Sequence, residues 1–308
     1  MGSIAVDYFG FVPVYVIIRW RRLWKWHGFR KERGALMADK YEYIVDIANR
    51  DTNIRGVLLY GSRANSEVQP DSYQDYDIYY IVKDKEAFDF SIFKNVVLRF
   101  VPSKVYPELF PNETTHLMLF ETGERIDLTI TTLKDFKAKA HTFEFCKCLL
   151  DKDGQLLEFN ANNHCEFWVK PIDKTTFDNT CAEFYWEIQN VVKGLKRDHL
   201  SYTMFLRDIA LRDMLNCMVD TYIGMLTDYS VSVGTLGRYR KSFLPKQYYE
   251  IYERTYLSNT VDDVWDSLFY MVDLFSLLGK HIAEKYDWDY SERTELFVRQ
   301  YLQSVRDQ

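Results

Sequence analysis

The sequence predicts an α+β protein in which a mixed sheet with flanking helices is followed by a helical bundle. Two observations predict this order. Short apolar and β-rich runs, separated by turn residues, fill the first half of the chain. Long segments with helical spacing begin near residue 176. Because 47% of the residues are hydrophobic and 17% are aromatic, the chain can build a substantial core.

The elements of the first half can be placed in order. Apolar residues recur at helical spacing over residues 37–49, which predicts an amphipathic helix. The β-rich runs predict strands at residues 55–60, 75–82, 96–101, 116–121 and 125–133. We expect the strand at 125–133 to be the last of the sheet.

The second half predicts long helices, at residues 177–198, 201–227 and 263–286. A loop rich in Asp, Gly and Asn at residues 151–164 is the expected boundary. The predicted organisation is therefore a first domain over residues 37–160 and a helical, substrate-binding domain over residues 161–308.

Residues 1–36 do not fit this organisation. Their apolar run, residues 9–18, is shorter than the roughly 20 residues that a membrane-spanning helix needs. Basic residues and tryptophans follow this run, whereas a signal peptide places its charges first. We expect a dispensable extension; a membrane-surface anchor is the alternative.

Charge and cysteine content limit the function classes. The whole chain has a net charge of −6 and residues 1–36 carry +5, so residues 37–308 carry −11. An acidic body disfavours nucleic acid as a partner and suits a polycationic small molecule. The five cysteines form no Cys-x-x-Cys pair, so we expect neither a disulfide framework nor a zinc site, and we expect a cytoplasmic protein.

Three carboxylates carry the chemistry. Asp75 and Asp77 stand two apart on a predicted strand, so their side chains share one face. Asp127 is the one charged residue between the apolar residues Ile126 and Leu128 on a later strand, and a charge in such a strand needs a partner. Carboxylates held together favour a hard cation, and Mg²⁺ is the natural choice where substrate phosphates complete its shell.

A turn precedes these carboxylates. Gly61 and Ser62 end the predicted strand at residues 55–60, and glycine lets the backbone turn sharply and approach a ligand. Backbone N–H groups and the Ser62 hydroxyl can hold phosphate oxygens, and Arg63 can add positive charge. The combination of Gly-Ser, Asp-x-Asp and a later lone aspartate is more specific than any of its parts, because Asp-x-Asp also occurs at residues 151–153 and 287–289.

This combination resembles the nucleotidyltransferase superfamily, which includes DNA polymerase beta. More closely, the chain resembles the aminoglycoside 6-adenylyltransferases, also called streptomycin adenylyltransferases. The resemblance runs from about residue 37 to the end of the chain. The stretches that carry it are residues 55–82, 105–111, 117–130, 149–154, 167–198 and 261–275.

The resemblance implies an N-terminal nucleotidyltransferase sheet of the DNA polymerase beta type, a C-terminal helical domain and an active site that uses ATP and Mg²⁺. It assigns phosphate holding to Gly61 and Ser62, and it assigns metal binding to the three carboxylates named above. Lys193 falls where the family has a lysine that meets the triphosphate; the alternative is a solvated lysine at a helix end.

The acceptor implied by the resemblance is streptomycin, adenylylated at its 6-hydroxyl. Asp178, Glu183 and Trp186 are the candidate acceptor-binding residues, because carboxylates and indoles suit guanidinium groups. Core packing is the alternative for tryptophan. Other aminoglycosides, a lincosamide or a protein side chain are alternative acceptors, and a catalytically inactive nucleotide-binding module is the alternative class.

Overall fold

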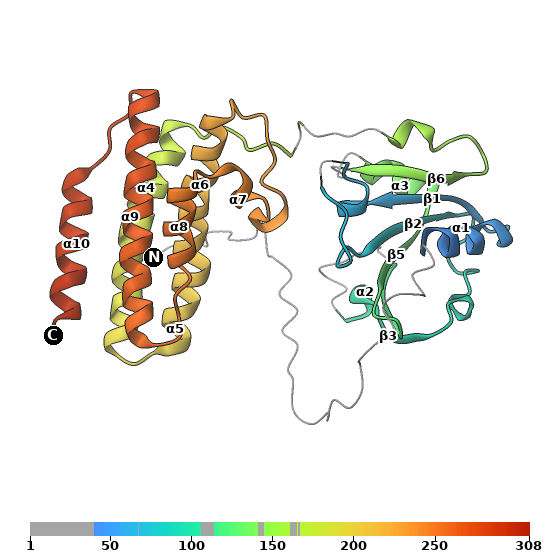
Figure 1. Ribbon diagram of the computed structural model, residues 1–308, viewed down its shortest axis with the longest axis horizontal. Helices are drawn as coiled ribbons and strands as arrows, with labels where there is room; N and C mark the ends of the chain where they lie inside the picture. Colours follow the sequence, from blue (N-terminus) through green and yellow to red (C-terminus); the bar gives the residue numbers. More distant parts are fainter. Residues whose placement is uncertain (1–39, 67, 106–113, 141–144, 161–164, 166) are drawn as a thin grey trace, which may run out of the picture. The chain divides into compact units, whose positions relative to one another are not determined.

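The structure is a computed structural model and describes residues 40–66, 68–105, 114–140, 145–160, 165 and 167–308 (Figure 1). The extension at residues 1–36 and the first three residues of the predicted opening helix lie outside the described residues. Helix α1, Lys40–Arg50, accounts for the rest of that prediction.

In the part of the chain that the structure describes, six strands form one mixed sheet, in the order β3-β4-β5-β2-β1-β6. The five predicted strands are confirmed, and no strand end differs from its predicted position by more than one residue. The strands are β1 Ile54–Tyr60, β2 Tyr76–Val82, β3 Val96–Phe100, β4 Thr115–Phe120, β5 Arg125–Thr132 and β6 Cys146–Asp151.

Strand β6 corrects the expectation that the run at 125–133 ends the sheet. It pairs antiparallel with β1 at the edge of the sheet. Its sequence, CKCLLD, is short and lacks the alternation of a half-buried strand, because only Cys146 is buried. Pairing with β1 therefore stabilises a segment that its own pattern does not identify.

The pairing of β2 with β5 is parallel, whereas the other strand pairs described are antiparallel. A parallel pair needs a long connection, and residues 83–124 provide it through β3 and β4. The consequence is that β2 and β5 begin at the same end of the sheet. The register places Asp77 directly beside Asp127.

Each face of the sheet packs against a helix. On one face, Tyr80 is fully buried and its hydroxyl donates a 2.7 Å hydrogen bond to the carbonyl of Ile44 in α1. On the other face, helix α3, Leu133–Lys139, places Phe136 against Tyr79, with ring centroids 5.4 Å apart. Side chains alternate along a strand, so Asp77 shares the α3 face with Tyr79.

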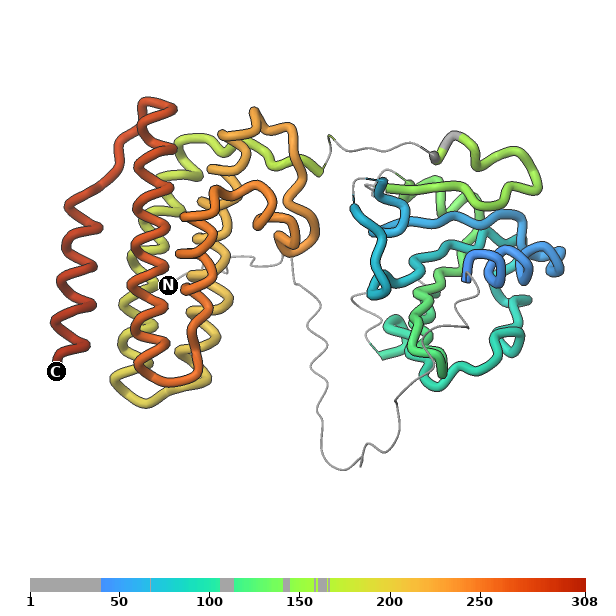
Figure 2. The backbone as a smooth tube through the Cα atoms, in the orientation of Figure 1, coloured from blue at the N-terminus to red at the C-terminus, as the bar shows by residue number. Residues whose placement is uncertain are grey.

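The second half of the chain is helical, as predicted (Figure 2). A π-helical segment, Leu206–Leu211, joins α5 to α6 without a break. The longer helices are α4 Lys174–Lys196, α5 Leu200–Phe205, α6 Arg212–Leu226, α8 Lys246–Arg254, α9 Val261–Tyr286 and α10 Glu292–Arg306; the single-turn helices are α2 Pro102–Val105 and α7 Arg240–Phe243.

The helix starts follow from polar side chains that accept hydrogen bonds from free backbone N–H groups. Asp173 accepts from Thr176 N at the start of α4. Thr260 and Asp263 form a reciprocal capping box at the start of α9. Such caps fix where each helix begins and so fix which residues face the core.

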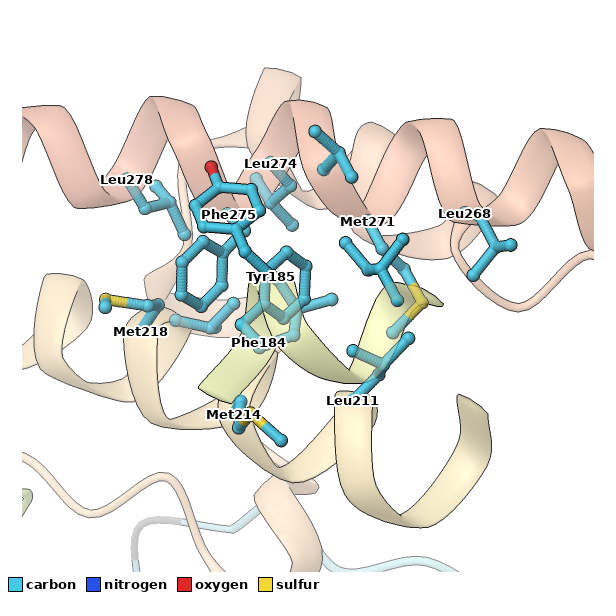
Figure 3. Close-up of a cluster of buried hydrophobic side chains, with 14 of the residues drawn as sticks. Phe184, Tyr185, Leu211, Met214, Met218, Leu268, Met271, Leu274, Phe275 and Leu278 are labelled. Carbon is cyan, nitrogen blue, oxygen red and sulfur yellow. The ribbon is translucent and has the colours of Figure 1, made fainter. Parts of the chain in front are cut away.

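Aromatic, methionine and leucine side chains from α4, α6 and α9 fill the core of the helical region (Figure 3). Phe184 and Phe275 stack at its centre, with ring centroids 3.8 Å apart and an interplanar angle of 2°. Both side chains are fully buried. Among the described residues, no helix is long and apolar enough to cross a membrane.

Replacement of Phe184 tests this core. Phe184→Ala removes a buried ring, and we expect it to lower the free energy of unfolding by about 3–5 kcal/mol. Trp186→Ala is the matched control on the same helix, because Trp186 is 68% exposed, and we expect a change within about 0.5 kcal/mol. Urea unfolding followed by circular dichroism measures both. Equal losses in the two variants would contradict the assignment of α4's buried face.

Candidate functional site

The candidate site lies where the parallel strands β2 and β5 begin. Asp77 is the second residue of β2 and Asp127 is the third residue of β5, and their Cα atoms are register partners. Neighbouring strands lie about 4.8 Å apart, so the two carboxylates stand side by side on one face. Their chain neighbours Ile78 and Ile126 point to the other face and are fully buried.

Asp75 differs from the prediction, because β2 begins at Tyr76 and Asp75 is therefore the residue before the strand. The Arg63 guanidinium holds Asp75 in place. Its Nε donates to the carbonyl of Asp75 at 3.0 Å, and its Nη2 donates to the carbonyl of Gln74 at 2.8 Å. Arg63 also lies 3.9 Å from the centroid of the Tyr76 ring. The predicted phosphate ligand Arg63 thus closes the loop that ends at Asp75.

Gly61 adjoins Asp77 at the end of β1. Its φ is +70°, and an added Cβ would lie 2.3 Å from Asp77 Oδ2. Glycine is therefore required here both for the left-handed backbone and for the space that the carboxylate fills. Ser62 follows in a short 3₁₀ turn, Gly61–Arg63, whose Ser62 carbonyl accepts from Gln74 Nε2 at 3.2 Å. The predicted phosphate-holding turn is thus brought beside Asp77.

Arg125 is a site residue that the sequence reasoning missed. It is the first residue of β5, and its guanidinium lies between two of the predicted carboxylates. Nη1 is 3.2 Å from Asp75 Oδ2, and Nη2 is 3.0 Å from Asp127 Oδ2. Spacing could have found it, because a residue two before Asp127 shares its strand face.

Burial and mutual repulsion disfavour ionisation of these carboxyl groups. Burial, together with the neighbouring Asp127 and Asp75 carboxylates, raises the pKa of Asp77 to about 7. Burial also raises the pKa of Asp127, and Arg125 opposes this shift. Tyr60, next to Gly61, has a pKa above its usual range because it is buried and lies near Asp77. The site therefore favours an additional positive charge.

The donor set fits a hard divalent cation. It consists of carboxylate oxygens, and Gly61 leaves the room that Asp77 Oδ2 fills. Arg125 already occupies the place of a cation between Asp75 and Asp127. In the described part of the chain, no three His, Cys, Asp or Glu side chains converge closely enough to hold a metal ion as they stand. Metal binding therefore requires the carboxylates of this site to move closer together.

Helix α4 carries the other predicted residues. Glu183, Trp186 and Lys193 fall on one exposed face, because residues three, seven and ten positions apart line up on a helix. Asn190 lies on this face and accepts a 3.4 Å hydrogen bond from Lys193. At 68% exposure Trp186 is not a core residue, so core packing is wrong for it.

Asp178 does not share a narrow stripe of α4 with Glu183. It is five residues before Glu183, which corresponds to a large rotation around the helix. Its carboxylate accepts a 2.7 Å bond from Lys174 one turn earlier. The structure therefore does not bring Asp178 together with the other predicted acceptor residues.

A separate pocket of about 280 Å³ lies within the helical region. Its lining contains no predicted site residue. It is formed by Phe167, Val169, Lys170, Ile172, Cys217, Asp220, Thr221 and Val233. Burial raises the pKa of Cys217, which keeps its thiol protonated and unreactive. Asp220 is engaged by Arg240 at 2.6 Å and 2.7 Å.

Comparison with known proteins adds to this geometry. A family model described as streptomycin adenylyltransferase matches residues 36–305. The aminoglycoside 6-adenylyltransferase of Bacillus subtilis (strain 168) is 31% identical over 264 residues, which cover 82% of this chain and 92% of that protein. The aminoglycoside 6-adenylyltransferase of Campylobacter jejuni is 28% identical over 259 residues, 81% of this chain and 89% of that protein. A solved structure of an aminoglycoside 6-adenyltransferase from Bacillus subtilis is 27% identical, covers 86% of this chain and 96% of that chain, and gives a TM-score of 0.43.

The electrostatics of the site predict a pH-dependent effect of Asp77→Asn on stability. The pKa of Asp77 is about 7 in the folded protein and about 4 in an unfolded chain. Between these values the folded state binds a proton that the unfolded state has released, so stability is lost as the pH rises. Asparagine does not titrate. The variant should therefore gain stability over the wild type between about pH 4 and pH 7 and reach a plateau of about 3–4 kcal/mol.

Urea unfolding in EDTA at several pH values measures this difference. Asp153→Asn is the control, because Arg55 lowers the pKa of Asp153. The stability that Asp153 contributes is present above its unfolded pKa, so its replacement gives no gain between pH 4 and pH 7. A pH-independent difference for Asp77→Asn would show that Asp77 is not held in a desolvated, anionic cluster.

Proposed function

Because the chain belongs to the streptomycin adenylyltransferase family, we propose that it transfers AMP from ATP to the 6-hydroxyl of streptomycin in a Mg²⁺-dependent reaction. Such a transfer would give resistance to the antibiotic. The observation that supports the chemistry is the juxtaposition of Asp77 and Asp127 beside the Gly61 turn.

The carboxylates and the Gly61 turn at the sheet would each have a role in this reaction. Asp75, Asp77 and Asp127 would hold Mg²⁺, which neutralises charge on the reacting phosphates when it is bound. The backbone N–H groups of the Gly61 turn and the Ser62 hydroxyl would hold phosphate oxygens. Asp127, or Glu183 of α4, would accept the proton of the attacking hydroxyl, because a carboxylate within hydrogen-bond reach can act as the base.

Helix α4 would provide acceptor and nucleotide contacts from its exposed face. The Glu183 carboxylate suits a guanidinium through charge-assisted hydrogen bonds, and the Trp186 ring suits it through cation–π contact. Streptomycin carries two guanidinium groups. Lys193, at the last turn of the same helix, would meet the triphosphate. The excess of acidic residues in 37–308 would attract a polycationic acceptor.

Incubation with ATP, Mg²⁺ and a panel of aminoglycosides tests the proposal. We expect mass spectrometry to show streptomycin heavier by one AMP, and to show kanamycin and gentamicin unchanged, because their compact ammonium groups lack the guanidinium fork. Asp75→Asn should lose the transfer without unfolding. If another aminoglycoside gains the AMP and streptomycin does not, that aminoglycoside is the acceptor and the assignment of streptomycin is wrong. A folded wild type with no product from any acceptor would favour the inactive nucleotide-binding module.

Replacement of Glu183 tests the acceptor site separately. We expect Glu183→Gln to weaken streptomycin binding roughly ten-fold or more, because it removes a charge-assisted hydrogen bond, and to leave ATP binding unchanged. Calorimetric titration of each ligand measures this. Glu284→Gln, an exposed glutamate of α9, is the control for loss of general negative charge. Equal losses in the two variants, or equal losses for both ligands, would remove Glu183 from the acceptor site.

A further inference from the structure

We propose that Arg125 is a positioning residue that exchanges partners during nucleotide binding: it releases Asp75 to the divalent cation and turns to the triphosphate. This inference rests on the proposed function and adds a residue to it. Its starting point is the geometry of Arg125, which joins two carboxylates from different segments of the chain, the residue before β2 and a residue of β5.

Among the described residues, the Arg125 contacts are longer than those of the other arginine–carboxylate pairs. Its nitrogen–oxygen distances are 3.0, 3.2 and 3.3 Å, whereas Arg240 contacts Asp220 at 2.6 and 2.7 Å. The Arg125 side chain is 46% exposed and that of Arg240 is 9% exposed. Long, solvated ion pairs contribute little and exchange easily. The arrangement therefore holds the carboxylates in place without trapping them.

Charge balance explains why the exchange is needed. Asp75, Asp77 and Asp127 present three carboxylates, and Arg125 is the cation paired with two of them. When the carboxylates are ionised, this set retains a charge of about −2, which a divalent cation would balance. Arg125 contacts Asp75 through Oδ2, and its positive charge repels a cation beside the same carboxylate, so the guanidinium and the cation compete for Asp75. The competition keeps metal affinity low until a ligand gives the guanidinium another partner.

The triphosphate of ATP is suited to be that partner. A guanidinium binds phosphate oxygens through paired N–H groups, as it binds carboxylates. Arg125 lies on the strand face that carries Asp127, so a guanidinium released from Asp75 stays at the site. Exchange of one anionic partner for another couples metal binding to nucleotide binding.

Two affinities that change in opposite directions test this coupling. In Arg125→Gln, Mn²⁺ alone should bind at least about five-fold more tightly than in the wild type, because a competing positive charge near the cation is gone. ATP in the presence of Mg²⁺ and without aminoglycoside should bind at least about five-fold more weakly, because a phosphate ligand is gone. Calorimetry and the electron paramagnetic resonance of Mn²⁺ measure these affinities without any turnover.

The control is Arg55→Gln, which removes an arginine–aspartate pair of the same sheet, with Asp153, and should change neither affinity. Arg125→Lys keeps the charge without the fork, so its Mn²⁺ affinity should stay near that of the wild type while its ATP affinity falls. Parallel losses of both affinities, unchanged Mn²⁺ affinity, or unfolding of both Arg125 variants would overturn the exchange. A wild type that binds neither Mn²⁺ nor ATP would instead overturn the proposed function.

Discussion

Two carboxylates on neighbouring strands repel each other, and this repulsion governs the end of the sheet where β2 and β5 begin. The parallel register places Asp77 beside Asp127, and burial strengthens their interaction because little water screens it. Arg125 relieves part of the repulsion by pairing with Asp127 and Asp75. When the carboxylates are ionised, positive charge nearby stabilises a sheet with this register, and the same electrostatics suit the site to a metal ion.

The backbone around these carboxylates is fixed by contacts that carry no chemistry of their own. Gly61 lacks a side chain and so leaves space for Asp77 Oδ2. Arg63 donates hydrogen bonds to the carbonyls of Gln74 and Asp75 and so holds the loop. Arg63 is engaged in this way, whereas the Arg125 side chain is 46% exposed and is the guanidinium that we propose turns to an incoming phosphate. Arg63 thus positions the loop before β2, whereas phosphate binding is the role that we propose for Arg125.

The sequence predicted the α+β class, five of the six strands that the described residues form, and the meeting of Asp77 with Asp127. Each of these depends on local alternation or on an aspartate placed between apolar residues of a strand. It did not predict β6, whose place depends on pairing with β1 rather than on its own pattern. It assigned Asp75 to a strand that begins one residue later. Arg125 was missed because a charged residue at a strand start has an ordinary explanation in solvent exposure, and only contacts with two carboxylates give it a specific one.

Helix α4 shows how one element can serve two purposes. Its inner face places Phe184 in a stacked aromatic core, while its outer face presents Glu183 and Trp186 to solvent. An exposed tryptophan gains nothing from hydrophobic burial within this fold, whereas an indole beside a carboxylate can bind a planar cation. Because the inner face fixes the helix rigidly, the outer residues keep their spacing without a ligand. A rigid face of this kind lowers the entropy lost on binding and favours selection of one acceptor geometry over others.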